Sequence, residues 1–354
     1  MSKHARLARA GAALLATSLV VVGCGSGGDE PQGGTSGEPV SAEWQAVIDA
    51  AKQEGHVTWY SVAPAGVRDA LKEGFEKKYG ITVEIRTIST AEMNAALEAE
   101  HDTGVDGADV VTSVGYGWIQ EKAAAGWFVD LSNVPSLQAP EWTASGYLVD
   151  DLYITAPLGL LVLAWNTTLF DGEINTYDDL LDPKLAGGVI GTVRPEPSLH
   201  ADHWAFIEEN FNENWLTEFA KQDPAIYPSA FANQEALAAG EIAVSAFVSA
   251  TDILALQEQG APLDFRVPSP VWAAQNVFFV PESSHRKNAA LLFIDYFASE
   301  EGQRAAAKYG YSPLESVAPE TLGGQSEVVL TNLERALDPN WHADYLAAWR
   351  ELYE

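Results

Sequence analysis

The sequence predicts an α/β fold in which mostly parallel sheets are flanked by helices. Short runs of β-branched and aromatic residues alternate with amphipathic stretches, and strands that alternate with helices pair as parallel sheets under covering helices. A first strand–helix–strand–helix–strand series occupies residues 56–114, and a second α/β series starts at residue 153. Because 47% of the residues are hydrophobic, the chain can bury the cores of two domains, as its length predicts.

The first series follows a helix that begins after Ser41. Ser41 is a good N-cap, apolar residues then recur with helical spacing, and Gly55 is a good helix stop. The next helix has the apolar stripe Val67, Leu71 and Phe75. The expected elements are strands over 56–62, 81–88 and 108–114 and helices over 67–80 and 91–100.

The second series opens with residues 153–166, which hold two apolar extended runs around Pro157 and Gly159. Strands and helices are then assigned from periods of two and of 3.6 residues. Strands are expected over 188–193, 242–247 and 275–280. Helices are expected near 176–181, over 200–221, 234–239, 250–259 and 286–308, and in the tail from 330 to 353.

The N-terminus has the pattern of an export signal. Lys3, Arg6 and Arg9 form a positive front before an apolar run over residues 10–22. That run is too short for a comfortable permanent membrane span and is typical of the apolar region of a signal peptide. We therefore expect a signal peptide over residues 1–23.

Cys24 is the only cysteine of the chain, so the body cannot form an internal disulfide and depends on its core for stability. The stretch VVGC at 21–24 resembles the bacterial lipobox, whose cysteine becomes the acylated N-terminus. Residues 24–40 are rich in Gly, Ser and Pro and are expected to form a flexible tether. The resemblance implies a lipoprotein with lipid, palmitate included, at Cys24.

The charge of the chain excludes several partners. The formal net charge is −30 at pH 7, and such a surface repels nucleic acids and anionic lipid headgroups. We therefore expect no nucleic-acid partner and no membrane contact other than a lipid anchor. The acidic surface favours solubility, and attraction of a cationic ligand is the alternative.

Parallel sheets place ligands beyond the carboxyl ends of their strands, where loops lead into helix N-termini. Backbone amides at residues 65–67 are candidates for receiving an anionic group there. Ordinary turn and cap chemistry is the alternative account of the serines and threonines in these loops. The rule selects, after the first and third strands of the series, Ser61, Val62, Ala63, Thr112, Ser113 and Tyr116.

Several stretches resemble, in family order over residues 45–315, an extracellular solute-binding lipoprotein of a bacterial ABC importer. The resemblance is to the type II periplasmic-binding-protein fold, in the branch of ferric-iron, thiamine, polyamine, phosphonate and sugar-phosphate binders. The stretches are VTWYS (57–61), FEKKYGITVE (75–84), ADVVTS (108–113), APLG (156–159) with WNT (165–167), YDDLLDPKLAG (177–187), EALAAGEIAV (235–244) and NAALLFIDYFASEEGQ (288–303).

The resemblance implies two lobes, each a mostly parallel sheet flanked by helices, joined by crossing hinge strands. The crossings would be residues 156–160 and 267–272, and a small solute would be clamped between the lobes and delivered to the permease subunits. A monomer on the outer face of the cytoplasmic membrane is implied, with no cofactor and no catalysis. The implied lobes are 41–167 with 272–318, and 168–271 with 319–354.

The resemblance also implies three contact segments in the second lobe and its return crossing. In the first, Arg194 and Ser198 are candidates to hold a carboxylate or phosphate, and pairing of Arg194 with surface acids is equally supported. Trp272 fits hinge packing at least as well as a stacking wall. The remaining candidates are Ser245, Phe247, Ser249 and Thr251 in the second segment and Gln275 beside Trp272.

Two alternative functions stay open. A ferric-iron binder of this branch would carry adjacent tyrosines after the strand at 242–247, where this chain has none, so an organic solute is favoured and no metal ligand is assigned. A lipid-anchored hydrolase would need a nucleophile and a base, and the chain has no Gly-x-Ser-x-Gly motif. His200 and His203 are interpreted as a solvated helix start rather than a metal pair.

Overall fold

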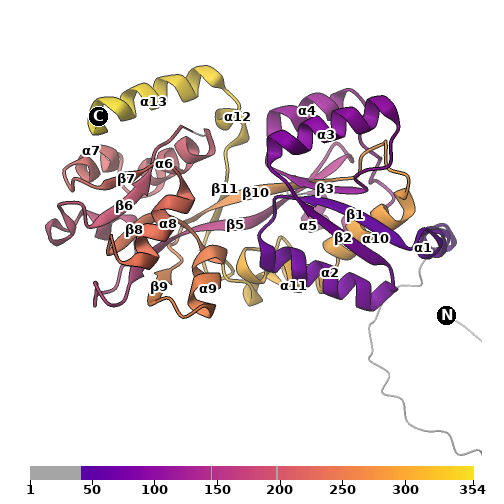
Figure 1. Cartoon of the computed structure of the whole chain (residues 1–354), viewed down its shortest axis with the longest axis horizontal. Coiled ribbons are helices and arrows are strands. Elements are labelled where there is room, and N and C mark those ends of the chain that lie inside the picture. The colour runs from indigo at the N-terminus through magenta and orange to yellow at the C-terminus, as the bar shows by residue number, and fades with distance from the viewer. Residues whose placement is uncertain (1–40, 145, 197) are drawn as a thin grey trace, which may run out of the picture. The chain divides into compact units, whose positions relative to one another are not determined.

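The computed structural model describes residues 41–144, 146–196 and 198–354 (Figure 1). The predicted signal peptide, tether and Cys24 lie outside the described residues. Helices flank a central sheet, which confirms the predicted α/β class. The first elements are α1 (Ala42–Glu54), β1 (His56–Ser61), α2 (Ala65–Tyr79), β2 (Thr82–Thr87), α3 (Thr90–Thr103), β3 (Val110–Ser113), α4 (Tyr116–Ala124), α5 (Pro140–Thr143) and β4 (Leu148–Val149).

The second part of the chain adds strands to the same sheet. Its strands are β5 (Tyr153–Asn166), β6 (Ile190–Val193), β7 (Ala225–Tyr227), β8 (Val244–Ser249), β9 (Leu263–Arg266), β10 (Val271–Phe279) and β11 (Val328–Leu330). Its helices are α6 (Ser198–Asn210), α7 (Trp215–Ala220), α8 (Ala230–Ala239), α9 (Ala250–Glu258), α10 (Lys287–Ala298), α11 (Glu300–Ala306), α12 (Leu333–Ala336) and α13 (Pro339–Tyr353).

The structure confirms the predicted first series of strands and helices, and it confirms the predicted caps of the helix that precedes the series. The Ser41 hydroxyl accepts a hydrogen bond from the Trp44 amide, and Gly55 closes α1 in the left-handed conformation. β1 is parallel to β2 and β3, and Ser61 at its end lies opposite Thr112. The carboxyl ends of β1 and β3 therefore lie side by side, as a parallel sheet requires.

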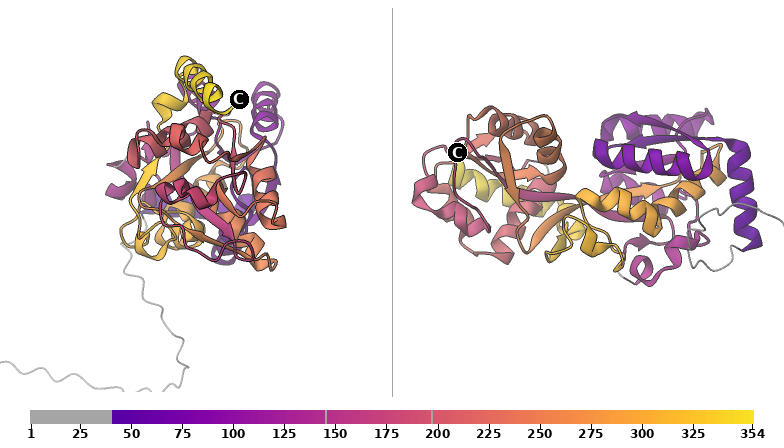
Figure 2. Two further views of the ribbon diagram at one scale, coloured as in Figure 1. Left: turned by 90° about the vertical axis from the view of Figure 1, so that its left-hand side faces the viewer. Right: turned by 90° about the horizontal axis from the view of Figure 1, so that it is seen from below.

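The strand order is β2-β1-β3-β10-β5-β8-β6-β7, with β11 beside β10 and with β4 and β9 beside β5. β6 is parallel to β7 and β8, whereas β5 and β10 run antiparallel to each other. We call β1–β3 with α1–α4, α10 and α11 the β1 half, and β6–β9 with α6–α9 the β6 half. The long strands β5 and β10 connect the two halves (Figure 2).

Residues 153–166 form one continuous strand, β5, rather than the two runs expected around Pro157 and Gly159. The first part of β5 pairs with β10, and its last residues pair with β8 and β9. The register between β5 and β10 shifts between Ala274 and Asn276, where Pro157 and Leu158 of β5 lie opposite the single residue Gln275. Because proline lacks an amide hydrogen, this bulge lets the strand continue through it.

Two expected helices are each split in two. The stretch 200–221 is α6 and α7, because the side chain of Asn212 accepts from the Asn214 amide and turns the chain between them. The stretch 286–308 is α10 and α11, because Ser299 is extended and caps α11 through the Gly302 amide. Apolar periodicity continues across both breaks, so it could not reveal them.

Large aromatic side chains fill the core of each half. In the β1 half, the ring centroids of Trp59 and Phe75 each lie 5.1 Å from that of Phe293. In the β6 half, Trp215 stacks on Phe219 at 4.3 Å between ring centroids. These cores supply the stability that a body without disulfides needs. The predicted boundaries of the two lobes stay a prediction.

Candidate functional site

A cavity of about 270 Å³ lies between the start of α2 in the β1 half and α9 in the β6 half. Both helices begin at the carboxyl ends of sheet strands, β1 and β8, which is where α/β sheets bind ligands. Three hollows are larger, two of about 580 Å³ and one of about 440 Å³, but residues of the β6 half, of the end of β5 and of the loop after it line them. The cavity lining is Pro64, Ala65, Gly66, Asp69, Thr251, Asp252, Leu254, Ala255 and Glu258.

The six predicted residues of the β1 half gather at the ends of β1 and β3, since the Val62 amide donates to the Thr112 carbonyl (3.1 Å). Most of their hydroxyls are used inside the protein. The Ser61 hydroxyl accepts from the Ala63 amide at 3.1 Å, and the Ser113 hydroxyl accepts from the Gly115 amide at 3.2 Å. Both serines are buried, so they shape the loops as turn chemistry predicts.

Three of the helices that follow strand ends at this edge of the sheet start without a side-chain cap, whereas α3 after β2 and α8 after β7 are capped. α2, α4 and α9 begin without a side-chain hydrogen bond at the N-cap. By contrast, Ser41, Ser89 and Ser229 cap α1, α3 and α8. The first-turn amides of uncapped helices are donors that suit an anionic or carbonyl group of a solute, although at the start of α2 the Val67 amide already donates to the Pro64 carbonyl at 3.1 Å.

Arg194 lies at the end of β6 and Ser198 starts α6. The Arg194 guanidinium is half exposed, with Nη1 3.0 Å from a Glu354 carboxylate oxygen and 3.6 Å from Glu196. This arrangement matches the alternative in which Arg194 pairs with surface acids. Its role toward an anionic solute stays a prediction.

The structure corrects the interpretation of His200 and His203 as a solvated helix start. His203 is 1% exposed, and its Nε2 lies 2.8 Å from the Tyr177 hydroxyl. His200 Nδ1 lies 3.2 Å from the Arg194 carbonyl, and the Phe247 ring packs against both imidazoles. Local spacing could not show that this face of α6 packs on β8. Burial lowers the pKa of His203 to about 3 and also lowers that of His200.

The residues of the second predicted contact segment lie on β8 and in the first turn of α9, beside the cavity. Phe247 is buried, and Ser249 shares a 2.6 Å hydrogen bond with Thr251, a cavity residue. Ser245 is fully buried and accepts from Asn233 at 2.7 Å. Of these residues, Ser249 and Thr251 are therefore best placed to contact a solute.

Trp272 and Gln275 lie on the crossing strand β10 and are both buried. The Trp272 indole donates to the Asp202 carboxylate at 2.8 Å, which fits hinge packing. The Tyr116 hydroxyl donates to the Gln275 carbonyl, and Gln275 Nε2 donates to the Thr331 carbonyl at 3.3 Å. Burial raises the pKa of Tyr116 above its ordinary value.

Sequence reasoning missed the acidic lining of the cavity. Asp69, Asp252 and Glu258 line it, although Asp252 follows the predicted Ser249 by only three residues. The sequence signal that could have identified them is their position in the two helices that directly follow the strand-end loops. Within the described residues, no three His, Cys, Asp or Glu side chains gather as a metal site.

Comparison with known proteins identifies the family. Residues 70–329 match the family of bacterial extracellular solute-binding proteins. A search of curated proteins finds no match by sequence.

Solved structures share the fold at low identity. A substrate-binding protein of an ABC transporter from Agrobacterium tumefaciens is 16% identical, with TM-score 0.67 over 86% of this chain and 97% of that chain. Iron-bound HitA from Pseudomonas aeruginosa is 21% identical, with TM-score 0.59 over 84% and 99%. AfuA from Actinobacillus pleuropneumoniae, with fructose-6-phosphate bound, is 19% identical, with TM-score 0.59 over 85% and 99%. These structures confirm the predicted type II periplasmic-binding-protein fold.

Proposed function

The chain belongs to the bacterial extracellular solute-binding proteins of ABC importers, and we propose that it captures a small organic solute between its β1 and β6 halves. Such proteins bind small solutes outside the cytoplasm and deliver them to permease subunits. One observation carries the proposal: the cavity of about 270 Å³ is lined from both halves, at the carboxyl ends of β1 and β8. A solute held there would contact both halves, which couples binding to closure.

The proposed ligand is organic rather than ferric iron. Tyr116 is the tyrosine among the predicted site residues, and its hydroxyl already donates to Gln275. Its raised pKa disfavours the phenolate that a trivalent cation would need. Solved structures of this fold hold iron in one case and fructose-6-phosphate in another, so the fold accommodates both kinds of ligand.

Two features of the site would select the polar groups of the solute. The uncapped starts of α2, α4 and α9 favour an anionic or carbonyl group. The carboxylates of Asp69, Asp252 and Glu258 favour an ammonium or hydroxyl group. We propose a polar solute whose anionic group faces the helix starts.

The proposed protein is a monomeric lipoprotein held at the membrane through Cys24, which lies outside the described residues. Every helix in the described part of the chain is too short or too polar to cross a membrane. The resemblance of residues 21–24 to a lipobox supports acylation. Binding rather than catalysis is proposed, because the predicted hydroxyls at Ser61 and Ser113 accept from backbone amides.

Thermal-shift measurements on the full chain with Cys24→Ser test the proposed function. The panel contains ferric citrate, thiamine, spermidine, aminoethylphosphonate and hexose phosphates. A true solute at 100 times its dissociation constant should stabilise the protein by about 2.7 kcal/mol. A panel in which only ferric citrate raises the melting temperature would contradict an organic solute.

A matched pair of variants locates the site. Ala255 lines the cavity, whereas Ala124, at the end of α4, is an exposed helical alanine outside the lining. Ala255→Trp should abolish the thermal shift by filling the cavity, and Ala124→Trp should keep it. Loss of the shift in both variants, or in neither, would contradict binding between α2 and α9.

A further inference from the structure

The short helix α12 is fixed to the β6 half through one buried carboxylate. Asp202 of α6 is fully buried, and its Oδ1 accepts from Arg335 Nε at 2.7 Å and lies 2.6 Å from Nη2. The Asn332 amide donates to Oδ2 of the same carboxylate at 3.2 Å. Arg335 also bonds Glu209 on the exposed side of α6. A two-pronged Arg–carboxylate contact fixes orientation as well as distance.

The same carboxylate joins α12 to the crossing strand β10. Trp272 Nε1 donates to Asp202 Oδ2 at 2.8 Å. The Thr331 amide donates to the Ala273 carbonyl at 3.1 Å, and Gln275 Nε2 donates to the Thr331 carbonyl. Residues 331–335 should therefore move together with the β6 half and the crossing strand β10.

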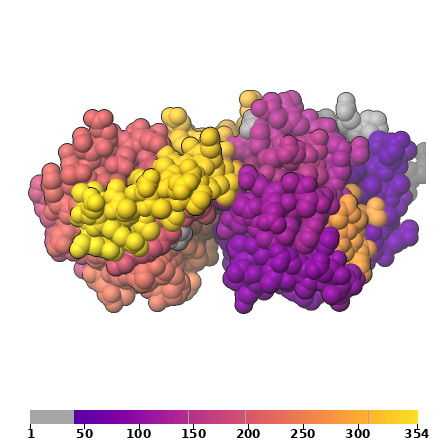
Figure 3. All heavy atoms as spheres, turned by 90° about the horizontal axis from the view of Figure 1, so that it is seen from above, coloured from indigo at the N-terminus to yellow at the C-terminus, as the bar shows by residue number. Residues whose placement is uncertain are grey.

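The other face of α12 is apolar and meets the β1 half. Leu333 and Leu337 pack against a buried cluster of the β1 half that contains Tyr116 and Ile119. A Cβ at Gly117 of α4 would lie 3.7 Å from Leu337 Cδ2, an ordinary van der Waals contact. In Figure 3 the C-terminal segment lies along the β6 half and reaches the atoms of the β1 half.

The contacts on the two faces of α12 differ in the free energy that breaking them costs. The Asp202–Arg335 contact is charge-assisted and its carboxylate is buried, so breaking it would leave a buried charge unpaired. Leu333 and Leu337 are only half-buried, and they make apolar contacts that separate without leaving polar groups unpaired. If the halves move apart, the leucine contacts with α4 are therefore the ones that break.

We propose that α12 is a latch between the halves, which moves with the β6 half and closes onto α4 beside Tyr116. Leu333 and Leu337 act as positioning residues, because they bias the empty protein toward the arrangement in which the cavity is lined from both halves. The inference rests on the proposed function for its effect on affinity. Its structural part stands on the contacts of α12 alone.

Distance measurements on the empty protein test the latch. Spin labels are placed on the full chain with Cys24→Ser, at Lys77→Cys in α2 and Glu213→Cys after α6, both exposed. Pulsed dipolar spectroscopy then gives the populations of short and long separations. Leu333→Ser with Leu337→Ser should raise the ratio of long to short separations about tenfold, given the apolar area lost. The same change should weaken binding of the panel's best solute.

Leu352→Ser is the matched control, since Leu352 is 41% exposed on α13 and lies outside the latch contacts. It should leave both populations as in the parent. Equal populations in the double variant and the control would overturn the latch. If no solute of the panel binds, the proposed function fails while the distances still decide the latch.

A cross-link keeps the test decisive if the double variant does not fold. Gly117→Cys with Leu337→Cys, joined by a short bismaleimide, should hold the two halves at the shorter separation. For this arm the separation is measured by scattering rather than by cysteine-directed labels. A linked protein that opens as freely as the unlinked one would overturn the proposal.

Discussion

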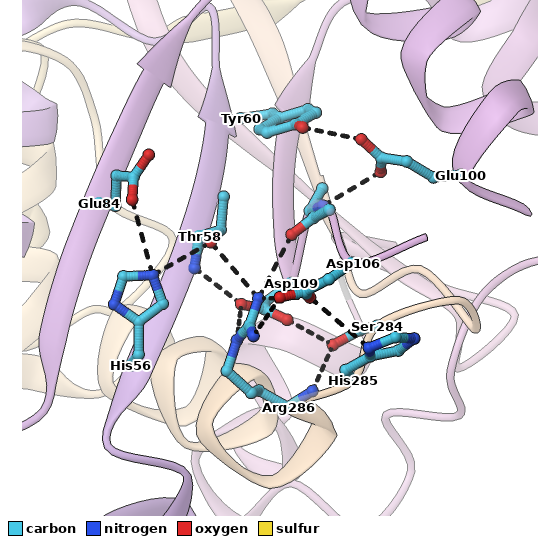
Figure 4. A network of polar contacts seen from close by, with 12 residues as sticks. His56, Thr58, Tyr60, Glu84, Glu100, Asp106, Asp109, Ser284, His285 and Arg286 are labelled. Carbon is cyan, nitrogen blue, oxygen red and sulfur yellow. Dashed lines mark hydrogen bonds and ion pairs between the residues drawn. The ribbon is translucent and has the colours of Figure 1, made fainter. Parts of the chain in front are cut away.

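Arg286 donates from Nε to the fully buried carboxylate of Asp109 at 2.7 Å, although 177 residues separate them in the chain (Figure 4). The same carboxylate accepts from the Thr58 amide at 2.7 Å and from the Ser284 hydroxyl at 2.8 Å. Hydrogen bonds to Asp106 and Asp109 raise the pKa of Arg286. The network joins β1, the residue before β3 and the start of α10, near the amino ends of strands whose carboxyl ends carry the site.

Asp109→Asn should destabilise the protein by about 3–5 kcal/mol, because it removes the buried charge that pairs with Arg286 and leaves only the exposed carboxylate of Asp106 to compensate the guanidinium. The measurement is urea unfolding followed by circular dichroism. Glu301→Gln is the control, since the Lys78–Glu301 pair has a similar length of 2.8 Å but lies on the surface. The control should cost under about 1 kcal/mol. Equal losses would show that burial of the pair is not what matters.

The buried imidazole of His203 predicts a pH dependence of stability. Burial and the neighbouring His200 lower the pKa of His203 to about 3, whereas an unfolded histidine titrates near about 6.5. Between these values the unfolded chain binds a proton that the native imidazole does not. The contribution of His203 is therefore complete above pH of about 6.5 and is lost as the pH falls toward 3, by up to about 1.4 kcal/mol per pH unit.

Urea titrations at pH values from 7 down to 4 check this slope. His203→Gln should flatten it, because glutamine does not titrate. His101→Gln is the surface control, since His101 is half-exposed and stacked on Trp127, and it should flatten the slope less than His203→Gln does. A slope unchanged by His203→Gln would mean that other groups cause the acid sensitivity.

Replacing Arg194 should lower the affinity for an anionic solute and should change the stability of the empty protein little. Arg194→Ala should weaken such a solute by about 1.5–3 kcal/mol, the range for a hydrogen bond to a charged group. Arg266→Ala is the control, since Arg266 is as exposed and also pairs with an acid, Glu173 at 3.6 Å. Calorimetric titration with the best anionic compound of the panel measures both. Unaltered affinity in Arg194→Ala would remove this residue from the site.

The predicted lipid at Cys24 has a direct readout. In the parent expressed in a bacterial host, mass spectrometry of the mature N-terminal peptide should find a diacylglyceryl group on Cys24, and the protein should sediment with membranes. Cys24→Ser should release it. Because Cys24 is the only cysteine, no other thiol can substitute. An unacylated mature N-terminus in the parent would contradict the anchor.

The sequence allowed prediction of the elements whose signal is local. Ser41 and Gly55 bounded α1 correctly, and the strand ends at Ser61 and Thr112 proved to be neighbours. The breaks after α6 and α10 were missed, because apolar periodicity continues across them. The burial of His203 was also missed, since it depends on the packing of α6 against β8.

The contacts that the sequence did not predict join residues that are far apart in the chain. Asp202 meets Arg335 across 133 residues, and the cavity joins residues 64–69 to residues 251–258. No local pattern of charge or period records such contacts. The strand-end rule nevertheless selected the edge of the sheet where the cavity lies, because parallel topology alone fixes where those ends lie.

A crystal structure of the protein with the solute that raises its melting temperature most tests the central claim directly. The account predicts electron density for that solute between the starts of α2 and α9, in contact with both halves. Density on one half alone, such as in the hollow lined by Asp171 and Lys184, with the cavity between the halves empty, would contradict it.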